Sequence, residues 1–112
     1  MLRLGLYTLD ADFNPVPCDD TRVWGVWFEH ADRVLAQDRD EAGGIDVAVS
    51  TVFLGADHNH GDGPPILWET RVFGGPHDGK GRRWHTKEQA LAGHQEYCRL
   101  VAGVDGTAPT IG

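Results

Sequence analysis

Hydrophobic and polar residues alternate most regularly in the middle of the chain, where two segments have the period of β-strands. Residues 45–54 are dense in β-branched side chains, and both of their faces are apolar enough to be largely covered. Residues 66–73 alternate in a similar way and are followed by two glycines and a proline. The pattern therefore predicts a central strand, a second strand and a loop at residues 55–65 that connects them.

The stretch after two adjacent aspartates has helical spacing instead. Steps of three and four residues separate its apolar side chains, and aspartate is a good helix N-cap. Residues 34–39 suit either a continuation of this helix or a strand, and we favour a strand because the turn-rich residues 40–44 follow. We therefore predict a short helix over residues 21–32, with an apolar stripe formed by Trp24, Trp27, Phe28 and Ala31.

The last helix has the clearest boundary signals. Thr86 and Gln89 have the spacing of a capping box, and Gly103 suits a C-terminal cap. His94 falls on the apolar stripe of this helix, and we interpret it as a core or rim histidine rather than a ligand. Residues 105–112 are small and polar, which favours a flexible C-terminal tail.

Weaker signals complete the architecture. Residues 4–9 favour a short strand, residues 13–17 contain two prolines and favour an extended arm, and residues 76–83 are typical of a polar loop. The predicted order is β-α-β-β-β-α. We therefore expect a single α+β domain over residues 1–104, with a mostly antiparallel sheet of three or four strands and two helices packed on one face.

Composition and charge exclude several classes of function. A chain of 112 residues builds one core, and its net charge of −7 repels phosphate backbones, which disfavours general nucleic-acid binding. Its segments fall short of the roughly 20 apolar residues of a membrane span, and its start does not resemble a signal peptide. The cytoplasm is therefore the expected location.

Free thiols are the favoured interpretation of Cys18 and Cys98, with a disulfide as the alternative.

The 55–65 loop concentrates the polar chemistry of the chain, with two carboxylates, two imidazoles and an amide within six residues. Long loops in compact domains are often functional. Asp57, His58 and His60 are candidate ligands for a divalent metal, although their spacing matches no established motif. The alternative is a polar turn whose side chains bond to their own backbone. The tripeptide His-Asn-His gives little support to an HNH nuclease, because the three residues of that name are spread over a larger unit and the chain lacks a broadly basic surface.

Glu69 lies within a strand that should be at least half buried, where a carboxylate must be paired or protonated. Arg71, two residues further along the same face, is the natural partner, and this ion pair is the favoured explanation. In the alternative, Glu69 faces the 55–65 loop and serves there as a base or a ligand.

A basic cluster at residues 80–87 comes just before the last helix and contains Arg83 and Trp84. Free amides at a helix N-terminus favour anions, and an indole can stack on a base, so a small phosphate-bearing ligand could bind here. The favoured alternative is a solvated loop whose tryptophan anchors the helix.

One longer pattern is specific. The string STVFLG…DH…GPP…ET…VFGG spans residues 50–75, and segments 24–32 and 84–94 carry further matching positions. On these residues the chain resembles a family of small uncharacterised proteins encoded by bacteriophages and prophages, especially those of actinobacteria. The family has no assigned activity, so the resemblance implies an origin rather than a mechanism. It implies that the motif positions include Asp57, His58, Glu69 and His94, whereas His60 and Asp62 lie in a more variable part.

The resemblance moves the predicted site from the two histidines of the loop to a cluster of Asp57, His58 and Glu69. We expect a non-enzymatic phage accessory protein without a cofactor, which binds a host protein or a small ligand in the host bacterial cytoplasm through the 55–65 loop. The alternative is a small metal-dependent hydrolase that uses the same cluster. A homodimer is also expected, because helices on one sheet face leave the other face to be buried. The residues expected to contact a ligand are Asp57, His58, His60, Trp68, Glu69, Arg71, Arg83 and Trp84.

Overall fold

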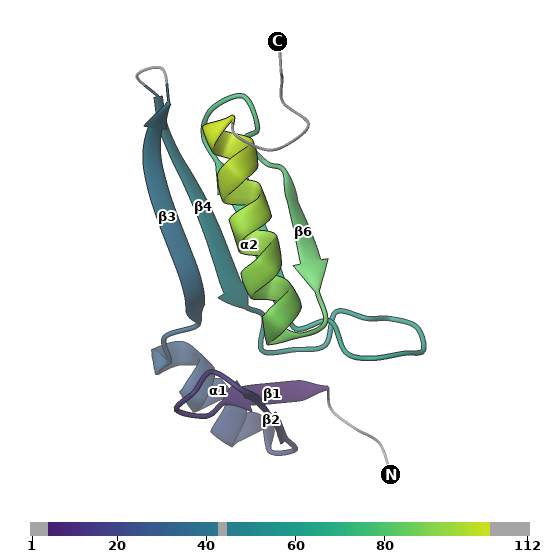
Figure 1. Cartoon of the computed structure of the whole chain (residues 1–112). Helices are drawn as coiled ribbons and strands as arrows, with labels where there is room; N and C mark the ends of the chain where they lie inside the picture. The colour runs from purple at the N-terminus through teal and green to yellow at the C-terminus, as the bar shows by residue number, and fades with distance from the viewer. Residues whose placement is uncertain (1–4, 43–44, 104–112) are drawn as a thin grey trace.

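The fold comes from a computed structural model that describes residues 5–42 and 45–103 (Figure 1). Within them the chain forms strands and helices in the order β1 (Leu6–Leu9), β2 (Pro15–Cys18), α1 (Thr21–His30), β3 (Val34–Ala42), β4 (Ile45–Phe53), β5 (Trp68–Phe73), β6 (Gly81–Trp84) and α2 (Lys87–Ala102). The predicted tail, residues 105–112, lies outside the described residues.

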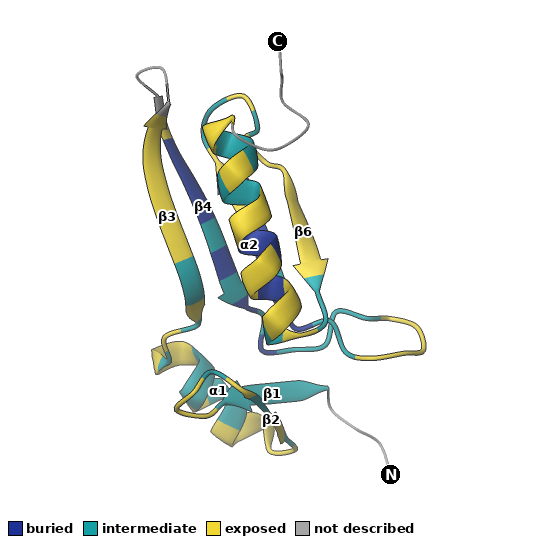
Figure 2. Ribbon diagram, viewed as in Figure 1, coloured by how far each residue is buried: buried dark blue, intermediate teal, exposed yellow. Residues whose placement is uncertain are grey.

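Strands β3 to β6 form an antiparallel four-stranded sheet in sequential order, and α2 lies along one of its faces (Figure 1). The described residues form two sheets, both antiparallel, together with two helices, so the predicted α+β class is confirmed. Buried residues follow β4 and the side of α2 that faces the sheet (Figure 2). The β-branched sequence of β4 therefore forms the centre of the core, as its pattern predicts.

The core beneath α2 is divided into two apolar clusters. One cluster contains Phe53, Trp68 and Ala90, and the other contains Val47, Val49 and Val72. The strand register places a layer of buried polar side chains between them, formed by Thr51, Thr70 and His94.

Helix α1 differs from the expectation that both helices pack on one face of the sheet. It packs against the small β1–β2 sheet, at one end of the molecule (Figure 1). The ring of Trp24 stacks on that of Phe28, with centroids 4.7 Å apart, and its indole N–H donates to the carbonyls of Tyr7 and Gly55. Trp27 instead contacts Phe53, which belongs to one of the two apolar clusters beneath α2. Most of the apolar stripe of α1 is thus used against the N-terminal sheet.

Two strands lie where the sequence predicts an arm and a loop. Pro15 and Pro17 of β2 are opposite Leu9 and Tyr7 of β1. The Tyr7 amide donates to Gly55 on the other side of β1, so Tyr7 and Pro17 are not a hydrogen-bonded pair. The nitrogens of both prolines therefore lie on the side of β2 away from β1, where no ladder donor is needed. Strand β6 pairs with β5, and Gly81 lies so close to the Thr70 carbonyl that a Cβ would collide with it.

The ends of the remaining elements follow their sequence signals closely. Asp20 caps α1, which ends two residues before the predicted boundary, and Thr86 and Gln89 form the predicted capping box of α2. Gly103 has φ of 73° and caps the C-terminus of α2. Strand β3 continues to Ala42, through part of the predicted break, because its backbone pairs with β4 over this length.

Candidate functional site

The 55–65 loop is fixed at its base by backbone hydrogen bonds on both sides. The amide of Tyr7 donates to the Gly55 carbonyl at 2.8 Å, and the amide of Asp57 donates to the Gly5 carbonyl at 2.8 Å. On the other side, the amide of His58 donates to the Ile66 carbonyl at 3.0 Å. The loop therefore starts and ends between β1 and the segment that leads into β5.

Two side chains organise the loop from within. Asp57 Oδ1 accepts from the amides of Asn59 and Ile66 at 2.7 and 2.9 Å. Asn59 Oδ1 accepts from the Gly61 amide, and its Nδ2 donates to the Pro64 carbonyl at 2.9 Å. These are the bonds of a polar turn, the structural alternative considered for this sequence. They order the loop without a ligand.

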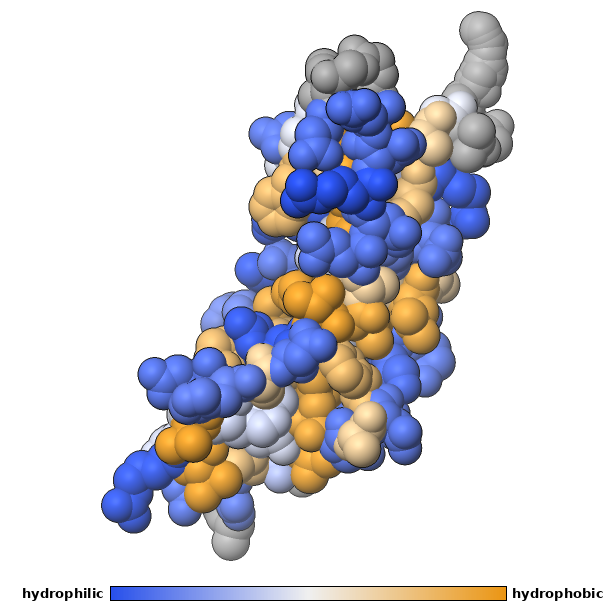
Figure 3. All heavy atoms as spheres, turned by 90° about the vertical axis from the view of Figure 1, so that its left-hand side faces the viewer, coloured by the Kyte–Doolittle hydropathy of each residue, from blue (hydrophilic) through white to orange (hydrophobic). Residues whose placement is uncertain are grey.

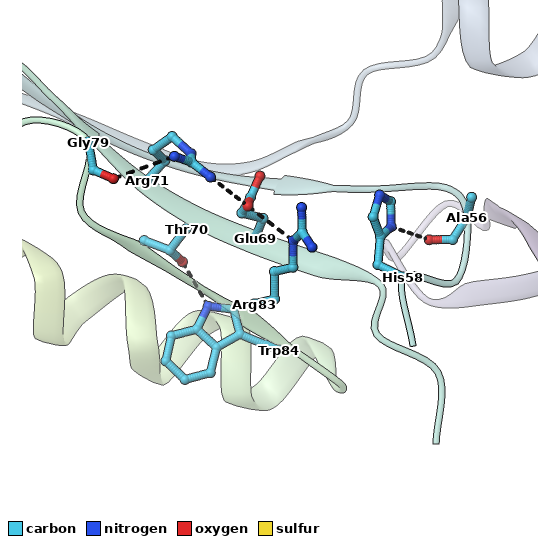
Figure 4. Close-up of polar contacts among 8 residues, drawn as sticks. All are labelled: Ala56, His58, Glu69, Thr70, Arg71, Gly79, Arg83 and Trp84. Carbon is cyan, nitrogen blue, oxygen red and sulfur yellow. Dashed lines mark hydrogen bonds and ion pairs between the residues drawn. The ribbon is translucent and has the colours of Figure 1, made fainter. Parts of the chain in front are cut away.

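His58 has a defined ring orientation. Its Nδ1 lies 2.9 Å from the Ala56 carbonyl, and because a carbonyl only accepts, Nδ1 carries the proton (Figure 4). In the neutral ring, Nε2 is therefore the atom free to accept or to bind a metal.

The predicted metal ligands of the loop do not converge. Among the described residues, one group of three potential ligands has its ligand atoms within 4.8 Å of one another, and it contains none of Asp57, His58 and His60. His60 is exposed at the tip of the loop. Two histidines separated by one residue can bind one metal ion when the backbone between them is extended, but here Asn59 closes a turn between His58 and His60.

Glu69 is bound to two arginines on the sheet face away from α2. Its Oε2 accepts from Arg71 Nη2 at 2.9 Å and from Arg83 Nε at 3.2 Å (Figure 4). The Glu69 side chain is 18% exposed, whereas the arginines are 44% and 48% exposed, so the guanidinium groups cover the carboxylate. The ion pair with Arg71, the favoured explanation, is present. Within the part of the chain that the structure describes, the polar side-chain contacts of Glu69 are with these arginines and not with Asp57 or His58.

The two tryptophans predicted to contact a ligand belong to the other side of the sheet. Trp68 is 0% exposed, which places its ring in the core and out of reach of a ligand. Trp84 is partly buried against Gly93 of α2, and its indole N–H donates to Thr70 Oγ1 at 2.9 Å. The predicted ligand residues are therefore divided between two faces, and Trp84 anchors the last helix as the structural alternative proposes.

A second constellation, which the sequence does not single out, crosses the interior beneath α2. From Trp84 Nε1 the chain of contacts passes to Thr70 Oγ1, then to Thr51 Oγ1 at 2.6 Å. Thr51 Oγ1 lies 2.8 Å from His94 Nδ1, and His94 Nε2 lies 2.7 Å from Asp38 Oδ2. Thr51, Thr70 and His94 are each 0% exposed.

One direction of donation satisfies every member of this chain. The indole N–H of Trp84 only donates, so Thr70 accepts from it and donates to Thr51. Thr51 then donates to Nδ1 of His94, and Nε2–H of His94 donates to Asp38. We therefore assign a neutral, Nε2-protonated His94.

Cys98 joins this chain at its outer end. Its thiol donates to Asp38 Oδ2 at 3.6 Å. The hydrogen bond from His94 holds the pKa of Asp38 below its ordinary value. Burial, followed by the negative charge of Asp38, raises the pKa of the Cys98 thiol to about 11. Asp38 and Cys98 line a cleft of about 300 Å³ between β3, β4 and the end of α2.

The sequence holds one partial signal of this constellation. His94 and Cys98 are four residues apart and thus share a face of α2. Asp38 is recognisable only from the pairing of β3 with β4, which places it opposite Val49 on the face under α2. Both cysteines are free, as predicted.

Comparison with protein-family models, with curated proteins and with solved structures finds no match for this chain. Neither helix of the described residues is long and apolar enough to cross a membrane.

Proposed function

We propose that this protein is a non-enzymatic binding module that recognises a protein partner with the tip of its 55–65 loop. The observation that carries the proposal is a projecting loop that is ordered by its own side chains and has an exposed tip at residues 60–64 (Figure 1). The resemblance to bacteriophage proteins supports a partner in the cytoplasm of a bacterial host.

The order of the loop matters for affinity. A loop that is already in its bound conformation avoids the entropic cost of ordering when it binds. Asp57 and Asn59 supply this order, and His85 adds to it because its Nδ1 donates to the Pro64 and Pro65 carbonyls. A projecting element also suits a recess on a larger partner better than it suits enclosure of a small ligand.

The geometry gives less support to the alternative of a metal-dependent hydrolase. Asp57 Oδ1 is used by two loop amides, and Glu69 Oε2 is used by two arginines. A hydrolase site also needs its base and its metal ligands within reach of one substrate, whereas Asp57, His58 and Glu69 do not form a group of converging ligand atoms in the described residues.

A pair of double variants tests the proposal. The first, His60→Ala with Asp62→Ala, removes two side chains from the tip of the loop. Within the described residues, the side chains of His60 and Asp62 take no part in the hydrogen bonds that order the loop. Asn59 bonds to Asp62 only through the backbone carbonyl of Asp62, which the substitution keeps. His30→Ala with Asp19→Ala removes the same residue types from exposed positions around α1 and is the matched control.

Partners are captured from extract of the bacterial host with wild-type protein, then purified and titrated by calorimetry. We expect the tip variant to bind a captured partner at least tenfold more weakly, with an unchanged melting temperature, while the control binds like wild type. The proposal is contradicted if the tip variant and the control variant bind every captured protein with equal affinity, or if no protein is captured. A His58→Ala variant that loses a catalysed turnover by orders of magnitude would support the hydrolase instead.

A further inference from the structure

We propose that Asp38, His94 and Cys98 form a binding site for Zn²⁺ that opens onto the cleft between β3, β4 and the end of α2. The three residues each offer one ligand atom, and these atoms lie within 4.8 Å of one another. The site is separate from the 55–65 loop and does not depend on the proposed function.

The types of ligand select the metal. Imidazole, thiolate and carboxylate together are typical ligands of Zn²⁺, whereas Mg²⁺ and Ca²⁺ prefer oxygen alone. A divalent cation between one thiolate and one carboxylate also leaves the site without net charge. Three protein ligands leave a fourth tetrahedral position, and the adjoining cleft of about 300 Å³ provides room for water or another ligand there.

Two of the three distances between ligand atoms need little adjustment, and the third, from His94 Nε2 to Cys98 Sγ, lies within 4.8 Å and must close to about 3.5 Å. With bonds of about 2.0 Å to nitrogen and oxygen and about 2.3 Å to sulfur, tetrahedral ligands lie about 3.3–3.5 Å apart. Cys98 Sγ is already 3.6 Å from Asp38 Oδ2. The distance from His94 Nε2 to Asp38 Oδ2 is 2.7 Å and must widen by roughly half an ångström. The Asp38 side chain is 64% exposed and therefore has room to make this movement.

The histidine ligand is held firmly. His94 and Cys98 project from successive turns of α2, and His94 is fully buried, which prevents its ring from turning away. Thr51 Oγ1 holds the opposite ring nitrogen at 2.8 Å, as the outer partner of a metal-bound histidine usually does. This contact aims Nε2 at Asp38 and Cys98.

Binding changes the proton positions in a balanced way. Cys98 releases its thiol proton to solvent and binds as thiolate, and Asp38 is already ionised. His94 keeps one proton, which moves from Nε2 to Nδ1 so that Nε2 can bind the metal. Nδ1–H then donates to Thr51 Oγ1, the Thr51 hydroxyl donates to Thr70 Oγ1, 2.6 Å away, and the Thr70 hydroxyl turns its hydrogen away from Thr51. The net result is one proton released for each Zn²⁺ bound.

The test uses the full chain, first freed of metal with a chelator. Zn²⁺ is titrated by calorimetry in buffers of different ionisation enthalpy, which counts released protons, and Co²⁺ serves as a spectroscopic probe. We expect one ion per chain, release of about one proton, and a thiolate-to-cobalt charge-transfer band with the intense visible bands of tetrahedral Co²⁺.

Variants locate the site. Cys98→Ser and Asp38→Asn should each weaken Zn²⁺ binding at least tenfold, and Cys98→Ser should abolish the charge-transfer band. These residues are at the edge of the core, so their variants should fold, and circular dichroism checks this. Thr51→Val should weaken binding about ten- to a hundredfold through loss of the outer hydrogen bond.

Three matched variants serve as controls. Cys18→Ser removes the other thiol, Asp40→Asn removes a neighbouring carboxylate of the same cleft, and His60→Ala removes a histidine of the loop. All three should bind Zn²⁺ like wild type. Absence of stoichiometric binding at micromolar Zn²⁺, or binding that survives Cys98→Ser and Asp38→Asn, overturns the proposal.

Discussion

Thr51 is the residue on which the buried polar layer depends, because its hydroxyl alone connects Thr70 to His94. Replacement by valine keeps the shape but leaves Nδ1 of His94 and the Thr70 hydroxyl without this partner. We expect Thr51→Val to lower the free energy of unfolding by about 1–3 kcal/mol, the cost of an unsatisfied buried polar group.

Chemical denaturation in the presence of a chelator measures this loss. Ser50→Ala is the matched control, since Ser50 is the neighbouring residue of β4 on the opposite face and makes no side-chain hydrogen bond in the described residues. Its effect should stay within about 0.5 kcal/mol. A Thr51→Val protein as stable as the control would show that the polar layer contributes nothing.

Cys98 carries a second prediction at the same scale. Burial and the Asp38 carboxylate raise its pKa to about 11, so its neutral form is favoured in the folded, metal-free protein. The associated stabilisation is complete below the unfolded pKa of about 9 and is lost as the pH rises through about 11.

The measurement is the rate of alkylation in a Cys18→Ser background, where Cys98 is the single thiol. The rate should rise with a midpoint near pH 11 in the folded protein and near pH 9 in denaturant. Coincident midpoints would contradict the environment described for this thiol.

The candidate residues of the sequence illustrate what local patterns can reveal. The pairing of Glu69 with Arg71 follows from strand alternation alone, and the structure contains it. Arg83 as a second partner required β6, which the pattern did not predict. The Asp38–His94–Cys98 group joins residues up to 60 positions apart, and only the register of β3 and the docking of α2 bring them together.

At the scale of elements, the docking of α2 depends on a glycine. A Cβ on Gly93 would overlap the indole of Trp84, which also donates to Thr70. We expect Gly93→Ala to destabilise the protein by about 1–3 kcal/mol, because this collision exceeds the gain of roughly 1 kcal/mol in helix propensity.

Gly25 provides the control, since it lies within α1 and a Cβ there would have no neighbour within 4 Å. Gly25→Ala should therefore stabilise the protein by up to about 1 kcal/mol. Thermal unfolding measures both variants, and the melting temperature should fall for Gly93→Ala and rise for Gly25→Ala. A stabilising Gly93→Ala would contradict the close packing of α2 on Trp84.

Elements with strong local signals could be predicted, and elements formed by pairing could not. The capping box of α2 and the β-branched run of β4 are local properties, and both were recognised. Strand β6 is a charged four-residue segment whose partner, β5, supplies most of its order. The position of α1 also escaped prediction, because an apolar stripe does not specify which sheet it will cover.

At the scale of the whole molecule, Gly55 connects the N-terminal β1–β2–α1 unit to the main sheet. It has φ of 78°, its carbonyl accepts from Tyr7 and Trp24, and a Cβ would lie 2.9 Å from the Phe28 ring. Gly55→Ala should therefore loosen this connection while the sheet and α2 remain folded.

Hydrogen exchange measures this effect residue by residue. We expect faster exchange of the Tyr7 and Asp57 amides in Gly55→Ala, with unchanged protection in β4 and α2. Gly61→Ala, in the exposed tip of the same loop and without a positive φ, is the control and should leave all of these amides unchanged. Uniform loss of protection in Gly55→Ala would instead indicate one cooperative unit.

The open face of the sheet bears on the predicted homodimer. It carries the Glu69 ion pairs together with Phe73, which is 51% exposed. Along the edge of the sheet, polar residues gather over β3 (Figure 3). The homodimer stays a prediction, and sedimentation equilibrium over a range of protein concentrations measures it.

The two prolines of β2 have a consequence for the behaviour of the chain at high concentration. An exposed strand edge is a template on which another molecule can add a strand, and such additions begin many aggregates. The outer edge of β2 offers carbonyls but lacks amide protons at positions 15 and 17, so an incoming strand finds only half of a ladder. Pro15 and Pro17 should therefore disfavour the addition of another strand at this end of the protein.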